Sequence, residues 1–203
     1  METEGRRYHH GDLRSALLDR AECTVRESGV DALSLRELAR EIGVSHAAPR
    51  RHFRDRNALL DALAIAGFAR LRRVLEESLK NATGDFREQV SAMALAYVRF
   101  ATDDAALLDL MFTGKHQAYA SAELGAAAEE CFELMFAVVR AGQQGGEIAP
   151  ADLTSVSTVL FATLQGLAAL TTGDLIDKNE LGPLTTYAVQ TLLRGLSPAH
   201  TVE

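Results

Sequence analysis

Apolar residues recur along this chain at the three- and four-residue spacing that places them on one face of a helix. The first stripe consists of Leu13, Leu17, Ala21 and Val25, and the Gly29 that follows fits a helix end. No segment shows a convincing alternation of apolar and polar residues, which is the pattern of a half-buried strand. We therefore predict an all-α fold.

Beyond residue 54 the same period predicts one long helix followed by several shorter ones. Asp55 fits the cap of a helix that reaches about Lys80, and Gly84 marks its break. Further helices are expected over 86–101, 105–112, 124–138, 153–171 and 184–195. The segment 153–171 is apolar on more than one side, which predicts burial by two neighbouring helices.

The stretch 34–53 predicts two short helices around a tight turn. The apolar face of the first helix is made by Leu35, Leu38, Ala39 and Ile42. Ser34 followed three residues later by Glu37 is the pattern of a capping box. Gly43 fits the left-handed residue that ends a helix, and Ser45 can cap the next one.

The second of these helices is dense in cationic and hydrogen-bonding side chains, namely His46, Arg50, Arg51 and His52. Pro49 is compatible with the first turn of this helix, where a missing N–H costs little. A short apolar-faced helix, a glycine turn and a basic helix form a helix-turn-helix, which places its second helix in a DNA major groove. The sequence therefore predicts a DNA-binding protein.

The distribution of charge supports this interpretation, although the net charge of the 203 residues is −7. Residues 1–56 carry 11 Lys or Arg against 10 Asp or Glu, while residues 57–203 carry 10 against 18. Positive charge is thus concentrated near the start of an otherwise acidic chain. A local basic face on an acidic body is the electrostatic footprint of a small DNA-binding module joined to a larger domain.

The remaining composition is that of an ordinary globular protein. Cys23 and Cys131 lie in apolar helical patterns and cannot build a disulfide framework, so we expect reduced core residues. The start of the chain lacks a secretory pattern, and Asp61 and Gln165 interrupt the most apolar segments before they reach a membrane-spanning length. We expect a cytoplasmic protein without a membrane partner.

The chain also lacks the short motifs that carry catalysis. It has no Gly-rich phosphate loop, no GxSxG, no HExxH and no cysteine pair at metal spacing. His9 and His10 are adjacent and have no apparent third ligand, which makes a poor metal site. We predict a protein that is not an enzyme and carries no cofactor or metal.

Three short motifs carry a resemblance to a known family: YHHGDLR at 8–14, GVSHAAP at 43–49 and HF at 52–53. They are similar to a branch of the TetR family of bacterial transcriptional regulators, which tends to have a C-terminal domain named for a Trp-His-Gly motif. The resemblance is strong over residues 8–68 and continues beyond them, where LMF at 110–112 matches the branch's pattern. It implies a dimeric DNA-binding regulator, most often a repressor, that responds to a small ligand.

The departures from the family pattern are informative. The family usually has Tyr at the position of Arg50 and Lys at that of Arg56, and both positions typically face phosphates. Arginine keeps or adds a cationic contact at each. The Trp-His-Gly motif corresponds here to Phe161, Gln165 and Gly166, of which only the glycine matches, so the resemblance supports DNA binding and leaves the ligand open.

The predicted DNA-contacting residues lie in the helix-turn-helix and just beyond it. They are Ser34, Arg36, Ser45, His46, Ala47, Arg50, Arg51, His52 and Arg56. His46 and Ala47 are expected to reach base edges, through a donated hydrogen bond and through packing on a thymine methyl respectively. The basic residues that follow are expected at phosphates, which position a protein without reading sequence.

Two alternatives stay open in this region. Ala47 can be small merely because helix packing requires a small side chain there. A solvated basic face would look the same in the sequence as a row of phosphate contacts. The residues Arg6, Arg7, Tyr8, His9 and His10 can form an arm along the DNA or a flexible, solubilising tail.

Polar and aromatic residues of the second domain are candidates for an apolar ligand cavity. The predicted lining residues are Tyr97, Met111, Phe112, His116, Phe161 and Gln165. Gln165 interrupts a buried stripe and must find a hydrogen-bond partner. The alternative for each residue taken singly is an ordinary place in the core.

We therefore predict a helix-turn-helix domain over 1–54 and a helical ligand-binding and dimerisation domain over 55–203. The helices at 151–172 and 181–196 are candidates for a homodimer interface of four helices, although the former also fits a central core helix. The expected function is binding of a palindromic double-stranded operator and release by a small apolar effector. The alternatives are a DNA-binding protein without an effector, and a helical ligand-binding or adaptor protein that has lost DNA binding.

Overall fold

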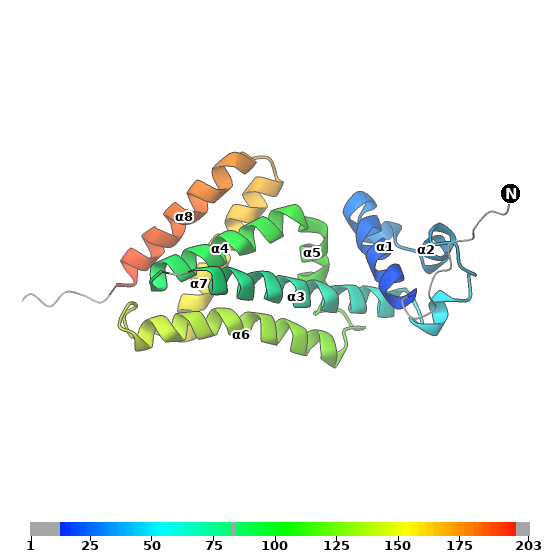
Figure 1. The fold of residues 1–203 in the computed structure, drawn as a ribbon, viewed down its shortest axis with the longest axis horizontal. Coiled ribbons are helices and arrows are strands. Elements are labelled where there is room, and N and C mark those ends of the chain that lie inside the picture. The colour runs from blue at the N-terminus through cyan, green and yellow to red at the C-terminus, as the bar shows by residue number, and fades with distance from the viewer. Residues whose placement is uncertain (1–12, 83, 198–203) are drawn as a thin grey trace, which may run out of the picture.

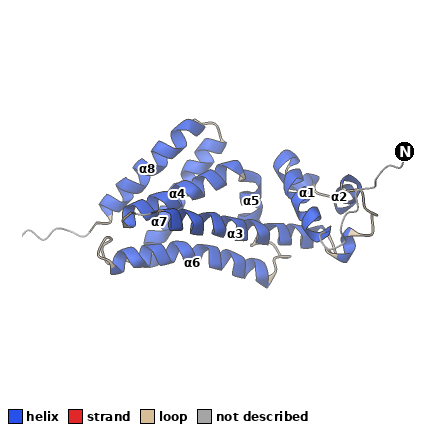
Figure 2. Ribbon diagram, viewed as in Figure 1, coloured by secondary structure: helices blue, strands red, loops and turns tan. Residues whose placement is uncertain are grey.

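The computed structural model describes residues 13–82 and 84–197, and within them it contains eight α-helices and no strand (Figure 2). The helices are α1 (Leu13–Ser28), α2 (Leu35–Glu41), α3 (Arg56–Asn81), α4 (Phe86–Asp103), α5 (Ala105–Gly114), α6 (Ala122–Gln144), α7 (Leu153–Thr172) and α8 (Lys178–Gly195). Two short 3₁₀ turns are also present, η1 (Val30–Ala32) and η2 (Pro49–Arg51). The predicted all-α fold is confirmed.

The molecule is elongated, with a small head at one end and a larger body at the other (Figure 1). The head consists of α1, η1, α2 and η2, and the body consists of α4 to α8. The long helix α3 begins beneath the head and runs along the body, where it packs against α4, α5 and α6. The head is thus joined to the body by α3 and by the contact of α1 with α5.

The helix α3 is the central helix on which the body packs, because one of its faces is buried along the helix. Leucine and phenylalanine side chains that are at most 5% exposed line this face: Leu59, Leu60, Leu63, Phe68, Leu71 and Leu75. A Cβ atom on Gly67 would lie 2.7 Å from the sulfur of Met111. The glycine therefore allows α5 to approach α3 closely.

Short polar side chains begin α3, α4, α6, α7 and α8. Each accepts a hydrogen bond of 2.7–3.0 Å from a backbone N–H of the first turn, which otherwise has no partner. These caps are Asp55, Asp85, Ser121, Asp152 and Asp177. The hydrogen bonds from Ser155 lower the pKa of the Asp152 carboxyl, because they favour its charged form.

The predicted helices are present, except for the second helix of the helix-turn-helix, and they differ mainly at their ends. The long helix has the predicted cap at Asp55 and ends at Asn81. The last helix begins at Lys178, earlier than expected, because it continues through Pro183. Neighbouring threonine hydroxyls donate to the carbonyls of Leu181 and Gly182 in the same turn.

The helix α7 has one buried and one exposed face. It packs against α4, α6 and α8, as predicted for an apolar helix between neighbours. Its outer face nevertheless leaves Val159 52% and Leu170 42% exposed. Within the described chain, α7 alone is long and apolar enough to cross a membrane by length and composition, with a mean hydropathy of 1.6 despite Gln165. Only 28% of that stretch is buried within the monomer.

Candidate nucleic-acid interface

The turn of the helix-turn-helix has the predicted glycine geometry. Gly43 has φ 74°, a left-handed conformation that glycine adopts without a steric cost. The N–H of Gly43 donates to the carbonyl of Arg40 at 3.3 Å, and the N–H of Val44 donates to that of Ala39 at 2.9 Å. These two bonds form a Schellman motif, which ends α2 and reverses the chain toward the basic segment.

The predicted capping box at the start of α2 is wrong. Ser34 is extended, with φ −139°, and its hydroxyl makes no capping hydrogen bond. The Glu37 carboxylate instead pairs with Arg40, three residues later, at 2.5 Å. Because the two partners of the expected box do not meet, the Ser34 hydroxyl stays available at the surface of the head.

The second helix is shorter and tighter than predicted. Ser45 caps no α-helix; its carbonyl accepts from the N–H of Ala48 at 2.9 Å, and the 3₁₀ turn η2 follows from Pro49 to Arg51. Proline lacks the N–H that would continue an α-helical ladder from Ser45, so the chain starts a new turn at this position. The carbonyl of Pro49 then accepts from the N–H groups of His52 and Phe53 at 3.0 and 2.9 Å.

Two buried residues hold this recognition segment, Ser45–Phe53, on the head. Pro49 is buried, and Phe53 is 2% exposed with the Arg14 guanidinium 5.4 Å from its ring centre. The side chains between and before these anchors are exposed: His46, Ala47, Arg50, Arg51 and His52. The segment therefore presents its polar and cationic side chains to solvent on a fixed base.

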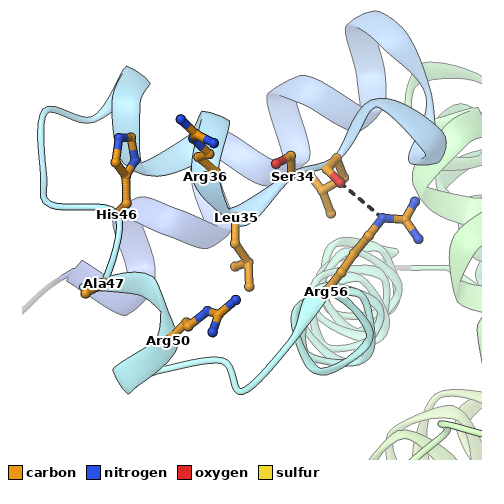
Figure 3. A pocket seen from close by; sticks show the side chains of 8 residues that line it. Ser34, Leu35, Arg36, His46, Ala47, Arg50 and Arg56 are labelled. Atoms are coloured by element: carbon orange, nitrogen blue, oxygen red, sulfur yellow. Dashed lines mark hydrogen bonds between the residues drawn. The ribbon is translucent and has the colours of Figure 1, made fainter.

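The recognition segment and α2 enclose an open hollow of about 580 Å³ (Figure 3). Its lining residues come from these two elements, from the residues before α2 and from the start of α3: Leu33, Ser34, Leu35, Arg36, His46, Ala47, Arg50 and Arg56. The Arg50 side chain extends from the recognition segment toward Leu35, so the two elements meet across the hollow (Figure 3). The charged residues of the lining are all arginines, which suits a polyanion.

Ion pairing separates these arginines from others in the head. Arg20 pairs with Glu41 at 2.5 Å, which raises the pKa of the arginine through that hydrogen bond, and Arg54 pairs with Asp55 at 3.2 Å. Among the described residues, Arg36, Arg50 and Arg51 have no such partner. Uncompensated positive charge is thus concentrated at the recognition segment and the exposed side of α2.

Arg56 has a different role from the other arginines of the hollow. Its Nε donates to the carbonyl of Leu33 at 3.0 Å, which is the dashed contact in Figure 3, and its Nη2 donates to that of Val30 at 2.6 Å. Asp31 lies 3.8 Å away. Arg56 therefore ties the first turn of α3 to the η1–α2 connection, a contact that the sequence did not reveal.

The predicted ligand residues of the body are distributed over several environments. Phe112 and Gln165 line a cavity of about 210 Å³ between α4, α5 and α7, and Phe161 lines a second of about 540 Å³ between α6 and α7. Met111 is fully buried against α3, whereas His116 is exposed in the turn after α5. Neither residue lines these two cavities.

Tyr97 lies inside the body, between α4 and α7. Its side chain is 5% exposed, and its ring meets that of Phe161 at 5.6 Å. Its hydroxyl has no hydrogen-bond partner among the described residues, and burial raises its pKa strongly. Burial likewise raises the pKa of the Cys131 thiol to about 11, so this cysteine stays protonated and unreactive.

A cluster of ion pairs at the junction of head and body escaped sequence analysis. The Nη1 and Nη2 atoms of Arg70, on α3, lie 2.5 Å from Glu22 and 2.7 Å from Asp104. Arg26, on α1, reaches the same two carboxylates at 2.8 and 2.6 Å. The Glu22–Arg26 spacing is a helical i,i+4 pair, but nothing in the sequence joins it to the other two residues.

Residues that could hold a metal are not grouped in this way. Within the described part of the chain, no three His, Cys, Asp or Glu side chains are placed to bind one ion. The predicted N-terminal arm, residues 6–10, lies outside the described residues.

Comparison with known proteins matches two family models to the head and the body. Residues 17–63 match the bacterial regulatory proteins of the tetR family, and residues 90–192 match the tetracyclin repressor-like C-terminal domain. The second match alone covers half of the chain. The chain belongs to the TetR family.

This TetR-family chain is also similar to solved structures along most of its length. A protein of unknown function from Rhodococcus sp. RHA1 is 45% identical, with a TM-score of 0.89, over 96% of this chain and 100% of that one. A TetR family transcription regulator from Marinobacter aquaeolei VT8 is 20% identical, with a TM-score of 0.74, over 92% and 96% of the two chains.

A curated relative adds a description in words. An uncharacterized HTH-type transcriptional regulator of Mycobacterium bovis is 22% identical over 82% of this chain and 84% of its own length. The protein is therefore a DNA-binding transcriptional regulator of the TetR family. Members of this family bind DNA and act as dimers, and the hollow of the head is the candidate DNA surface.

Proposed function

We propose that this protein is a sequence-specific repressor that binds a palindromic operator as a homodimer and is released by a small apolar ligand. The observation that carries the proposal is the hollow of the head, where Arg36 and Arg50, which have no ion-pair partner among the described residues, lie beside an exposed histidine and alanine. A surface of this kind can neutralise phosphates and present short side chains to base edges.

The contacts divide into two classes. His46 and Ala47 are exposed at the start of the recognition segment and read base edges in the major groove. Phosphates are contacted by the hydroxyl of Ser34 and by the basic side chains around it, which are Arg36, Arg50, Arg51 and His52. Arg56 positions the hollow through its two backbone hydrogen bonds.

The exposed apolar side chains of α7 and α8 support a dimer through these helices. Tyr187 of α8 is 64% exposed, Leu175 in the turn between the two helices is 77% exposed, and Val159 and Leu170 are exposed on α7. A Cβ atom on Gly166 would meet nothing within 4 Å, which leaves room for a closely packed partner helix. Large apolar side chains exposed on two neighbouring helices are typical of an interface.

The ion-pair cluster at the junction provides a route from ligand to DNA. Asp104 lies at the connection between α4 and α5, and Ala101, Ala105 and Leu108 near it line the cavity of about 210 Å³. A ligand that moves this connection displaces the carboxylate shared by α1 and α3. Such coupling is typically about 1–3 kcal/mol and is reciprocal, so operator DNA weakens ligand binding by the same factor.

Selection from random duplex DNA at about 0.15 M salt tests the proposal. We expect a palindrome whose half-sites are separated by one helical turn of DNA or a multiple. The variants Arg36→Ala and Arg50→Ala should weaken binding to all sequences and each reduce the salt slope by about 1. Arg99→Ala, an exposed arginine of α4, serves as the control. Recovery of unenriched DNA would contradict the docking surface. Undiminished DNA binding by the protein that carries both Arg36→Ala and Arg50→Ala would also contradict it.

A further inference from the structure

The cavity between α6 and α7 has a chemistry of its own. Its volume is about 540 Å³, within the ordinary range of ligand pockets. The lining consists of Glu129, Phe132, Glu133, Met135, Phe136, Thr158 and Phe161. Three aromatic rings and a thioether thus form the walls, two carboxylates lie among them, and no basic residue takes part.

Ion pairs on α6 single out one of these carboxylates. Glu130 pairs with Arg72 at 2.5 Å, and Glu133 pairs with Arg140 at 3.1 Å. Glu129 has no ion-pair partner among the described residues and lines the cavity. The cavity therefore keeps an uncompensated negative charge beside aromatic faces.

The aromatic rings themselves attract positive charge. The Nζ atom of Lys115 lies 5.1 Å from the ring centre of Phe132 and 5.4 Å from that of Phe112. Both distances are within the range of a cation–π interaction. The cluster already holds one cation of the protein, and Lys115 does not line the cavity.

We propose that the cavity between α6 and α7 binds a hydrophobic organic cation. The aromatic walls take the apolar body of the ligand, and Glu129 balances its charge. An anion of the same size would meet the carboxylates of the lining without any basic partner there. The inference refines the small apolar effector of the proposed function to one that also carries a positive charge, and it rests on the proposed function only for its consequence at the DNA.

The cavity is connected to the head through packed rings. Phe161 lies 5.3 Å from Phe132 and 5.7 Å from Phe112, measured between ring centres. Phe112 belongs to α5, which begins directly after Asp104 of the ion-pair cluster. A ligand that displaces Phe161 therefore acts on α5 and on the junction.

Two ions of equal size and shape but opposite charge test the class of ligand. We would titrate the purified full chain with tetraphenylphosphonium and with tetraphenylborate by calorimetry. The expected result is at least tenfold tighter binding of the cation, with one site per chain. Equal affinities, or tighter binding of the borate, would overturn the proposal.

Variants locate the binding. Glu129→Gln should weaken binding of the cation at least threefold and reduce the ratio of cation affinity to anion affinity. Phe136→Leu should also weaken binding of the cation, because one aromatic ring is lost. The matched control is Glu123→Gln, which removes the same charge from an exposed site on the same helix. Unchanged affinity in both cavity variants would show binding elsewhere and overturn the assignment.

The same titration separates this inference from the proposed function. If tetraphenylphosphonium binds at the cavity and also releases the selected operator, both stand. Binding at the cavity without release would refute the proposed release and leave the ligand class intact. Release without the dependence on Glu129 would refute the ligand site alone.

Discussion

Two arginines of the same hollow have different tasks, although both are cationic and lie six residues apart. Arg50 extends from the recognition segment and has no ion-pair partner among the described residues. Arg56 donates to the carbonyls of Val30 and Leu33. The first is available to DNA, whereas the second holds the head together.

Substitution by lysine should therefore affect the stability of the protein differently at the two positions. Arg56→Lys keeps the charge but cannot make both hydrogen bonds, so we expect the free energy of unfolding to fall by about 1–2 kcal/mol. Arg50→Lys should change stability little, because no internal bond is lost. Thermal and urea unfolding of the two variants measure the difference. Equal stability of both would show that the Arg56 bonds contribute nothing.

Glycines provide a second comparison between residues. Gly43→Ala forces a side chain into a left-handed conformation, which should cost about 1–2 kcal/mol. Gly125 lies inside α6 with open space around its Cα, so Gly125→Ala should stabilise the protein by roughly 0.5–1 kcal/mol. Denaturant titration of both variants measures whether each one lowers or raises the free energy of unfolding. A stabilising alanine at position 43 would contradict the turn described here.

At the scale of elements, the helices could be predicted because each has an apolar stripe and several begin at a polar cap, as at Asp55. The long α3 follows from such local signals alone. The recognition segment could not be predicted in detail, because Pro49 was compatible with either an α-helix or a tighter turn. The choice depends on how the buried proline and Phe53 pack on the head.

The residues of the functional surfaces also differ in whether a local sequence pattern reveals them. His46 and Arg50 could be assigned from a local motif, and the structure brings them to one hollow. Arg70 and Asp104 are distant in sequence from their partners on α1, so no local pattern reveals them. Glu129 was missed as well, since an exposed glutamate on a helix resembles any solvated charge.

The ion-pair cluster gives a prediction about elements rather than single residues. Asp104 accepts a hydrogen bond from Arg26 of α1 and forms an ion pair with Arg70 of α3, and its side chain is 16% exposed. We expect Asp104→Asn to lower the free energy of unfolding by about 1–3 kcal/mol and to weaken the link between ligand and operator. Asp103→Asn, at an exposed neighbour that has no ion pair within the described residues, is the control. Equal unfolding curves for the two would contradict the role of the cluster.

At the scale of the whole molecule, the exposed face of α7 and α8 predicts the oligomeric state. Val159→Asp together with Tyr187→Glu places charge on that face, which should convert a dimer to a monomer in sedimentation experiments. Because two linked heads bind more tightly than one, operator affinity should fall about 100-fold or more. Ala126→Glu adds a charge to an exposed site on α6 and should leave the dimer intact. A dimeric double variant would place the interface elsewhere.

The two anchors of the recognition segment have a consequence for engineering. Pro49 and Phe53 fix its backbone from beneath, while the side chains that face outward contribute little to the core. Residues 46, 47, 50 and 51 can therefore be randomised together without loss of folding. A library at these four positions should yield regulators that recognise new operators while the body, and with it the response to the effector, is inherited unchanged.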